Sequence, residues 1–155
     1  MATAVRTRGT SAPASGGAAT GLRVLAIFLG VFLIFEGLGK LAWLGNSGLL
    51  GEQLQGWLKS ATPGNRWYLE ILMPGIPLFA RLVVFGELAA GTALVMGFWT
   101  RLAAFVAFLM VLNFHFASGR LFAYAFLTNG YGLPVLGGLL ALAIGGVRLP
   151  WSVRA

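Results

Sequence analysis

A single acidic residue, Glu87, lies at the centre of the apolar run 76–99, and this feature constrains the chain more than any other. A transmembrane helix needs about 20 predominantly apolar residues, so the run is long enough to cross a bilayer. A carboxylate near the bilayer centre costs on the order of 3 kcal/mol on insertion scales, and such groups face a protein interior rather than lipid. The run therefore predicts a membrane-spanning helix that packs against its neighbours around a polar group.

The composition supports a membrane protein. Of 155 residues, 58% are hydrophobic and only 10% are charged, whereas about 25% are charged in an ordinary soluble domain. The formal net charge is +7, but the basic residues stand singly near the ends of apolar runs. Such flanking charges orient membrane helices, so we expect contact with the lipid bilayer and no binding of nucleic acid.

The scarcity of metal and redox ligands limits the chemistry of the chain. It has no cysteine and a single histidine, His115. These counts exclude a disulfide, a thiolate metal site, an iron–sulfur cluster and a haem held by two histidines of one copy. No catalytic residue set and no metal site is predicted, and any electrons must come from a partner or a diffusible quinone.

The apolar pattern predicts an all-α polytopic membrane protein, a bundle of four transmembrane helices at 22–44, 76–99, 102–118 and 121–147. Helix-breaking residues from Asn129 to Pro134 interrupt the last run. Its helix therefore has an alternative start near Leu133, after an interfacial stretch.

The chain divides into three parts on this interpretation. Residues 1–21 form a disordered cytoplasmic tail, residues 22–149 the four-helix transmembrane domain, and residues 150–155 a C-terminal tail. The connection 45–75 has apolar residues on one face of each of two short segments. It predicts interfacial helices with Trp and Tyr at headgroup depth, forming either a lid or a cap over a lateral opening.

Basic residues are more frequent on the side of the membrane that holds both termini. That side carries Arg6, Arg8, Arg23, Arg101, Arg148 and Arg154, and the other carries Lys59, Arg66 and Arg120. Because cytoplasmic loops are enriched in Lys and Arg, both termini are expected in the cytoplasm.

Small residues recur at four-residue spacing on each predicted span, which favours close helix packing within the chain or against a second chain. The stripes are Ala26 with Gly30, Ala89 with Ala93 and Gly97, Ala103 with Ala107, and Gly137 with Ala141 and Gly145.

The polar residues of the spans are expected between the bilayer centre and the outer interface. They are Glu36, Lys40, Arg81, Glu87, Asn113 and His115. The two glutamates balance Lys40 and Arg81 in formal charge, and Lys40 could instead extend to the headgroups. Asn113 and His115 are two residues apart, so at most one of them faces the cluster centre.

This cluster has two interpretations. The polar groups could satisfy one another and fix helix register, or they could form a ligand site. A quinone headgroup would fit, because Lys40, Arg81 and His115 could donate hydrogen bonds and a glutamate could relay protons. His115 could alternatively ligate a chlorin magnesium. No tightly bound cofactor is predicted.

Several motifs resemble the DoxX family of small four-helix membrane proteins. They are Arg23 at the start of the first span, Gly39-Lys40 in GLGKL, Asn129, and the series Glu87, Gly91, Gly97, Thr100 and Arg101 in ELAAGTALVMGFWTRLAA. The acidic residue that often follows the family's last helix is absent, although Gly145, Gly146 and Ser152 are present.

The resemblance implies a multi-pass protein of the bacterial plasma membrane. It favours a redox-associated or quinone-interacting accessory subunit of a membrane oxidoreductase, not catalytic alone. One alternative is a non-catalytic structural subunit of a larger respiratory or photosynthetic complex, and another is a small-molecule transporter. Expected partners are membrane or soluble oxidoreductase subunits, or further copies of the chain.

Overall fold

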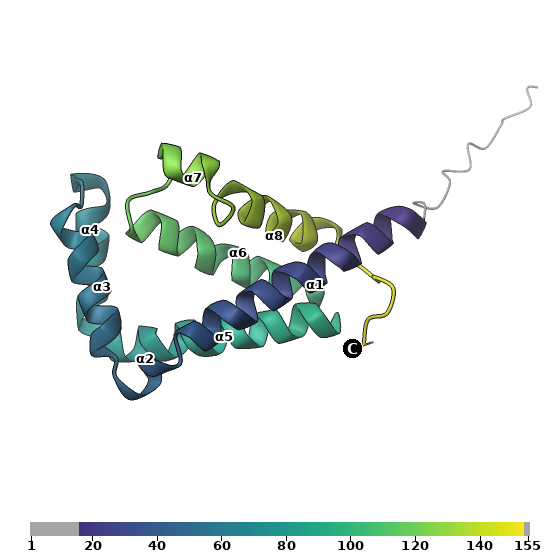
Figure 1. Ribbon diagram of the computed structural model, residues 1–155, viewed down its shortest axis with the longest axis horizontal. Helices are drawn as coiled ribbons and strands as arrows, with labels where there is room; N and C mark the ends of the chain where they lie inside the picture. The colour runs from purple at the N-terminus through teal and green to yellow at the C-terminus, as the bar shows by residue number, and fades with distance from the viewer. Residues whose placement is uncertain (1–15, 154–155) are drawn as a thin grey trace, which may run out of the picture.

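The structure, a computed structural model, describes residues 16–153 (Figure 1). Within these residues all regular secondary structure is helical. The predicted tail residues 1–15, including Arg6 and Arg8, and Arg154 near the other end lie outside the described residues.

Helices α1 (Gly16–Gly39), α5 (Ile76–Met96), α6 (Thr100–Ala117) and α8 (Leu133–Gly145) form an elongated bundle (Figure 1). Each contributes buried side chains to one apolar core, among them Leu33, Leu94, Ala104 and Leu139. Outward-facing residues are also apolar, such as Phe28 and Phe35, which are 71% and 69% exposed. An apolar core combined with an apolar outer surface is typical of a helix bundle that is surrounded by lipid.

In the described part of the chain, three helices are long and apolar enough to cross a membrane. They are α1, α6 and the helical run Pro63–Met96 that contains α5. Helix α8 is a shorter apolar helix of 13 residues. At 1.5 Å per residue it is about 20 Å long, less than the hydrocarbon thickness of about 30 Å.

The first helix is displaced from its predicted position. It begins at Gly16 rather than Leu22, so the expectation of disorder is wrong for residues 16–21. It ends at Gly39 rather than Leu44, because Lys40 and Leu41 form a turn before the short helix α2 (Ala42–Gly45). Lys40 therefore lies in a turn outside α1, next to the polar cluster.

The connection between α1 and α5 contains α3 (Gly48–Lys59), α4 (Pro63–Leu72) and a 3-10 turn, η1 (Met73–Gly75). These helices lie across the end of the bundle remote from the start of α1 (Figure 1). Their apolar faces share a second core with α5 and α6, formed by Leu50, Leu54, Leu69, Ala80 and Ala117. The Asn65 amide of α4 also donates a 3.1 Å hydrogen bond to the Ala117 carbonyl.

The last predicted span is interrupted where its sequence indicated. Helix α7 (Tyr124–Thr128) ends just before Asn129, and α8 begins at Leu133. The alternative start near Leu133 is therefore confirmed, and α7 with the following turn takes the place of a helix over the earlier part of 121–147.

Arg23 joins α1 to the end of α5 and to the segment after α8. Its guanidinium donates hydrogen bonds to the carbonyls of Leu94 at 2.8 Å, Val95 at 2.6 Å and Trp151 at 3.2 Å. The side chain is buried, so it is a structural residue and more than the flanking charge that the sequence suggested. Two of these carbonyls, those of Leu94 and Val95, lie in the last turn of α5, where helix carbonyls lack full intrahelical pairing.

Helices α1 and α5 are in close backbone contact at a pair of glycines, Gly30 and Gly91. A Cβ atom at Gly91 would lie 2.7 Å from the Gly30 carbonyl oxygen, and a Cβ at Gly30 equally close to the Gly91 carbonyl. The stripe predicted on α5 is wrong for Ala89, which is exposed. Gly91 makes the close contact instead.

Gly91→Ala is expected to destabilise the protein by about 2 kcal/mol, because overpacking against backbone forces the helices apart. The measurement is unfolding of the full chain in detergent, followed by tryptophan fluorescence. Gly137→Ala is the matched control, since a Cβ there meets nothing within 4 Å. Equal stability of the two variants would show that the glycine contact is dispensable.

Candidate functional site

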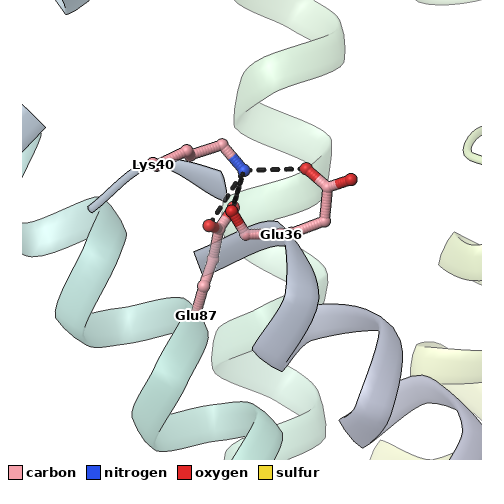
Figure 2. Close-up of polar contacts among 3 residues, drawn as sticks. All are labelled: Glu36, Lys40 and Glu87. Atoms are coloured by element: carbon pink, nitrogen blue, oxygen red, sulfur yellow. Dashed lines mark hydrogen bonds and ion pairs between the residues drawn. The ribbon is translucent and has the colours of Figure 1, made fainter. Parts of the chain in front are cut away.

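Lys40 joins two glutamates in an ion triad, Glu36–Lys40–Glu87 (Figure 2). Its ammonium lies 2.8 Å from Glu36 Oε2 and 2.9 Å from each carboxylate oxygen of Glu87. The triad connects the end of α1 to the middle of α5, residues separated by 47 positions in the chain. It therefore ties together the two helices that also meet at Gly30 and Gly91.

The backbone around Lys40 explains how the three groups meet. Glu36 lies on the last turns of α1, and Lys40 stands one turn further in the chain, so its ammonium also reaches the Glu36 carbonyl at 3.2 Å. Gly37 faces α5, where a Cβ would lie 2.9 Å from the Leu88 side chain and 3.3 Å from Glu87 Cβ. Glycine at this position lets α1 come close enough to α5 for the ion pair.

The triad uses the whole hydrogen-bonding capacity of Lys40. An ammonium has three N–H donors, and here they serve the Glu36 carbonyl, the Glu36 carboxylate and the Glu87 carboxylate. The Phe114 ring centroid lies 5.7 Å from the ammonium, within cation–π range. With both carboxylates ionised, the triad carries one negative charge in excess.

The two carboxylates have different surroundings. The side chain of Glu87 is 7% exposed, whereas that of Glu36 is 40% exposed. Glu36 is therefore the partner that water or a ligand can reach, and Glu87 is the buried end of the triad.

A cavity of about 290 Å³ opens beside the triad, and we call it the triad cavity. Its wall combines aromatic rings with polar groups from α1, α3, α5, α6 and the α6–α8 connection. The lining residues are Phe32, Leu33, Glu36, Lys40, Gln53, Glu87, Val111, Phe114, His115, Arg120, Ala125, Phe126, Asn129 and Tyr131. Such a mixture can hold a planar ring and orient it through hydrogen bonds.

The structure brings four of the six predicted polar residues to this cavity. His115 lies on its wall, where its Nε2 donates to the Tyr131 carbonyl at 2.9 Å. Asn113 points elsewhere and accepts a hydrogen bond from the Tyr68 hydroxyl on α4. The expectation that Asn113 and His115 diverge is thus met.

Arg81 does not belong to the site. It is exposed and donates to the Pro77 carbonyl of its own helix at 2.8 Å. The expected charge balance through Arg81 is therefore wrong. Arg120, which the sequence placed only among the outer basic residues, lines the triad cavity instead. Its position just after the third predicted span, 102–118, was the available signal in the sequence.

These features define an all-α membrane protein with an ion triad inside its helix bundle. The family model DoxX matches residues 21–120, and the chain belongs to the DoxX family. The matched region includes the triad, His115 and Arg120, whereas the α7 side of the cavity lies beyond it. Comparison with curated proteins and with solved structures gives no match.

Lys40→Met is expected to destabilise the protein by about 3 kcal/mol, because removing one member of a buried ion pair leaves the other charge uncompensated. Denaturant unfolding in detergent at neutral pH measures the change. Lys59→Met is the control, since this exposed lysine at the end of α3 forms no ion pair within residues 16–153. If both lysine variants unfold alike, the triad does not stabilise the fold.

Proposed function

We propose that this DoxX protein is a quinone-interacting accessory subunit of a membrane oxidoreductase in the bacterial plasma membrane. The observation that supports this proposal is the triad cavity, in which a buried carboxylate–ammonium pair faces aromatic walls. The family resemblance points in the same direction. The subunit holds the quinone, and a partner protein supplies or removes the electrons.

The proposed topology has four spans and both termini in the cytoplasm. Helices α1, α5 and α6 cross fully, and α8 with its flanking segments makes the fourth crossing. Helices α3 and α4 then lie at the outer surface, with the exposed Trp67 near the headgroups. The triad cavity would open in the outer half of the membrane.

The chemistry of the cavity wall suits a quinone headgroup. A quinone is a planar ring with two carbonyl acceptors. The cations Lys40 and Arg120 can donate to such oxygens, and Phe32 and Phe114 can contact the ring faces. Lys40 has no free donor, so it would exchange the exposed Glu36 for a quinone oxygen while Glu87 retains it.

Quinone reduction in the cavity also requires a path by which protons reach the ring oxygens. Reduction of a quinone to a quinol takes two electrons and two protons. A glutamate beside the ring can pass a proton when its carboxyl group alternates between protonation states. Glu36, exposed at the cavity, and Glu87, buried behind Lys40, stand where such a relay needs them. The electrons must come from the partner, because this chain has no cysteine and only one histidine.

Glu87→Gln is expected to weaken quinone binding about tenfold, because charge-assisted hydrogen bonds contribute roughly 1.5–3 kcal/mol and here hold Lys40 at the cavity wall. Full-length protein purified in a mild detergent is titrated with short-chain ubiquinone and menaquinone analogues. Glu52→Gln, an exposed acid of α3, is the control. Native quinone content is measured by extraction and mass spectrometry, and the absence of both native and added quinone would overturn the proposal.

One observation favours the alternative of a structural subunit. Gly137 and Ala141 of the predicted α8 stripe are exposed, and a Cβ at Gly137 would meet nothing within 4 Å. The other face of α8 packs on α1, where a Cβ at Gly138 would lie 2.9 Å from the Leu29 side chain. A small-residue face that is free in the monomer can receive a helix of another chain.

Gly137→Leu is expected to reduce assembly with that second chain without lowering monomer stability, because the added side chain blocks close helix approach. Light scattering after size-exclusion chromatography in mild detergent measures the assembled fraction. Gly21→Leu is the control, another exposed glycine with open space around it. An unchanged assembled fraction for Gly137→Leu would count against this face as an interface.

A further inference from the structure

The two ends of the bundle differ in charge. The whole sequence has four acidic side chains. They lie toward the α3–α4 end of the bundle or in the middle of α5, and they are Glu36, Glu52, Glu70 and Glu87. The opposite end, which holds the start of α1 and the segment after α8 (Figure 1), carries Arg23, Arg101 and Arg148. The outer nitrogens of the Arg23 guanidinium donate to backbone carbonyls, and its Nε has no partner within the described residues. Within residues 16–153, the ion pairs are those of the triad, so Arg101 and Arg148 have no carboxylate partner.

A cavity of about 880 Å³ lies at this end, and we call it the arginine cavity. It is formed by the α5–α6 turn and the segment 146–153 that follows α8. Arg101 and Arg148 are its charged lining residues, and no acidic side chain lines it. A cavity with two guanidinium groups and no carboxylate favours an anion from outside the chain.

The cavity walls are fixed by contacts on both sides. Leu149 is buried in the main core, the Trp151 carbonyl accepts from Arg23, and the Val153 amide donates to the Met96 carbonyl at 3.0 Å. Arg101 is held through its Nε, which donates to the Ala143 carbonyl at 2.9 Å. This bond leaves the outer nitrogens of the Arg101 guanidinium free for a ligand. The arginine cavity is thus a built feature of the fold.

We propose that the arginine cavity binds the phosphate group of an anionic phospholipid. Guanidinium groups match phosphate through paired N–H donors. Trp99 and Trp151, which also line the cavity, are 60% and 73% exposed, and Trp is typical of the headgroup depth of a membrane. The phosphate of a phospholipid lies at headgroup depth, while its acyl chains lie beside the apolar surface of the bundle. Inorganic phosphate has the same anionic oxygens but no acyl chains to hold it there.

The test uses the full-length chain in a neutral detergent, titrated with phosphatidylglycerol, with phosphatidylcholine and with inorganic phosphate, and followed by native mass spectrometry. Phosphatidylglycerol is expected to bind the parent chain more tightly than the other two. The double variant Arg101→Gln, Arg148→Gln should bind it about 25-fold more weakly, since each arginine near an anionic surface contributes about 1 kcal/mol. Lys59→Gln removes the same charge at the opposite end of the bundle and should bind like the parent.

The single variant Arg148→Gln provides a second measurement should the double variant fail to fold, because the exposed Arg148 side chain forms no hydrogen bond within residues 16–153. It should bind about fivefold more weakly. Displacement of the lipid by inorganic phosphate at equal concentration would identify free phosphate as the source of the bound group and support the phosphate site. Binding of phosphatidylglycerol that is unaffected by both variants, or matched by phosphatidylcholine in every variant, would overturn the proposal.

Discussion

The ammonium of Lys40 is the group on which the bundle depends, because it allows a carboxylate to lie inside a low-dielectric protein. Glu87 is buried at the middle of α5, and a charge there needs a partner. Within residues 16–153 its ion-pair partner is Lys40, just after α1, and Gly37 leaves room for the Leu88 side chain where α1 packs on α5. The pairing of these helices, the turn that ends α1 and the wall of the triad cavity all follow from that requirement.

Some of this organisation could be predicted from the sequence, because membrane physics leaves few choices. An apolar run of about 20 residues is helical, so α5 was expected at 76–99 and is found at Ile76–Met96. The pairing of Glu87 with a cation is expected for the same reason.

The prediction that Arg81 belongs to the polar cluster is wrong, because depth in the membrane alone does not fix the direction of a side chain. Six residues turn a helix by about 240°, which points Arg81 away from the face that carries Glu87. Arg120 and Gln53 reach the cavity from other elements, through tertiary packing that local pattern does not contain.

The two cavities give the molecule two chemically different ends. One contains an ion triad with aromatic walls, and the other contains tryptophans and two arginines that form no ion pair within residues 16–153. The asymmetry arises from the placement of very few charges in an apolar chain.

The three-carbonyl contact of Arg23 links regions that are synthesised at very different times. Two of its acceptors lie 71 and 72 residues downstream, and the third lies 128 residues downstream. During translation the first helix can therefore engage the end of α5 while the last helix is still within the ribosome. Its guanidinium acquires the final acceptor only when residue 151 has emerged. All three contacts therefore require synthesis through residue 151, and a nascent chain shortened before this residue lacks the third acceptor of Arg23.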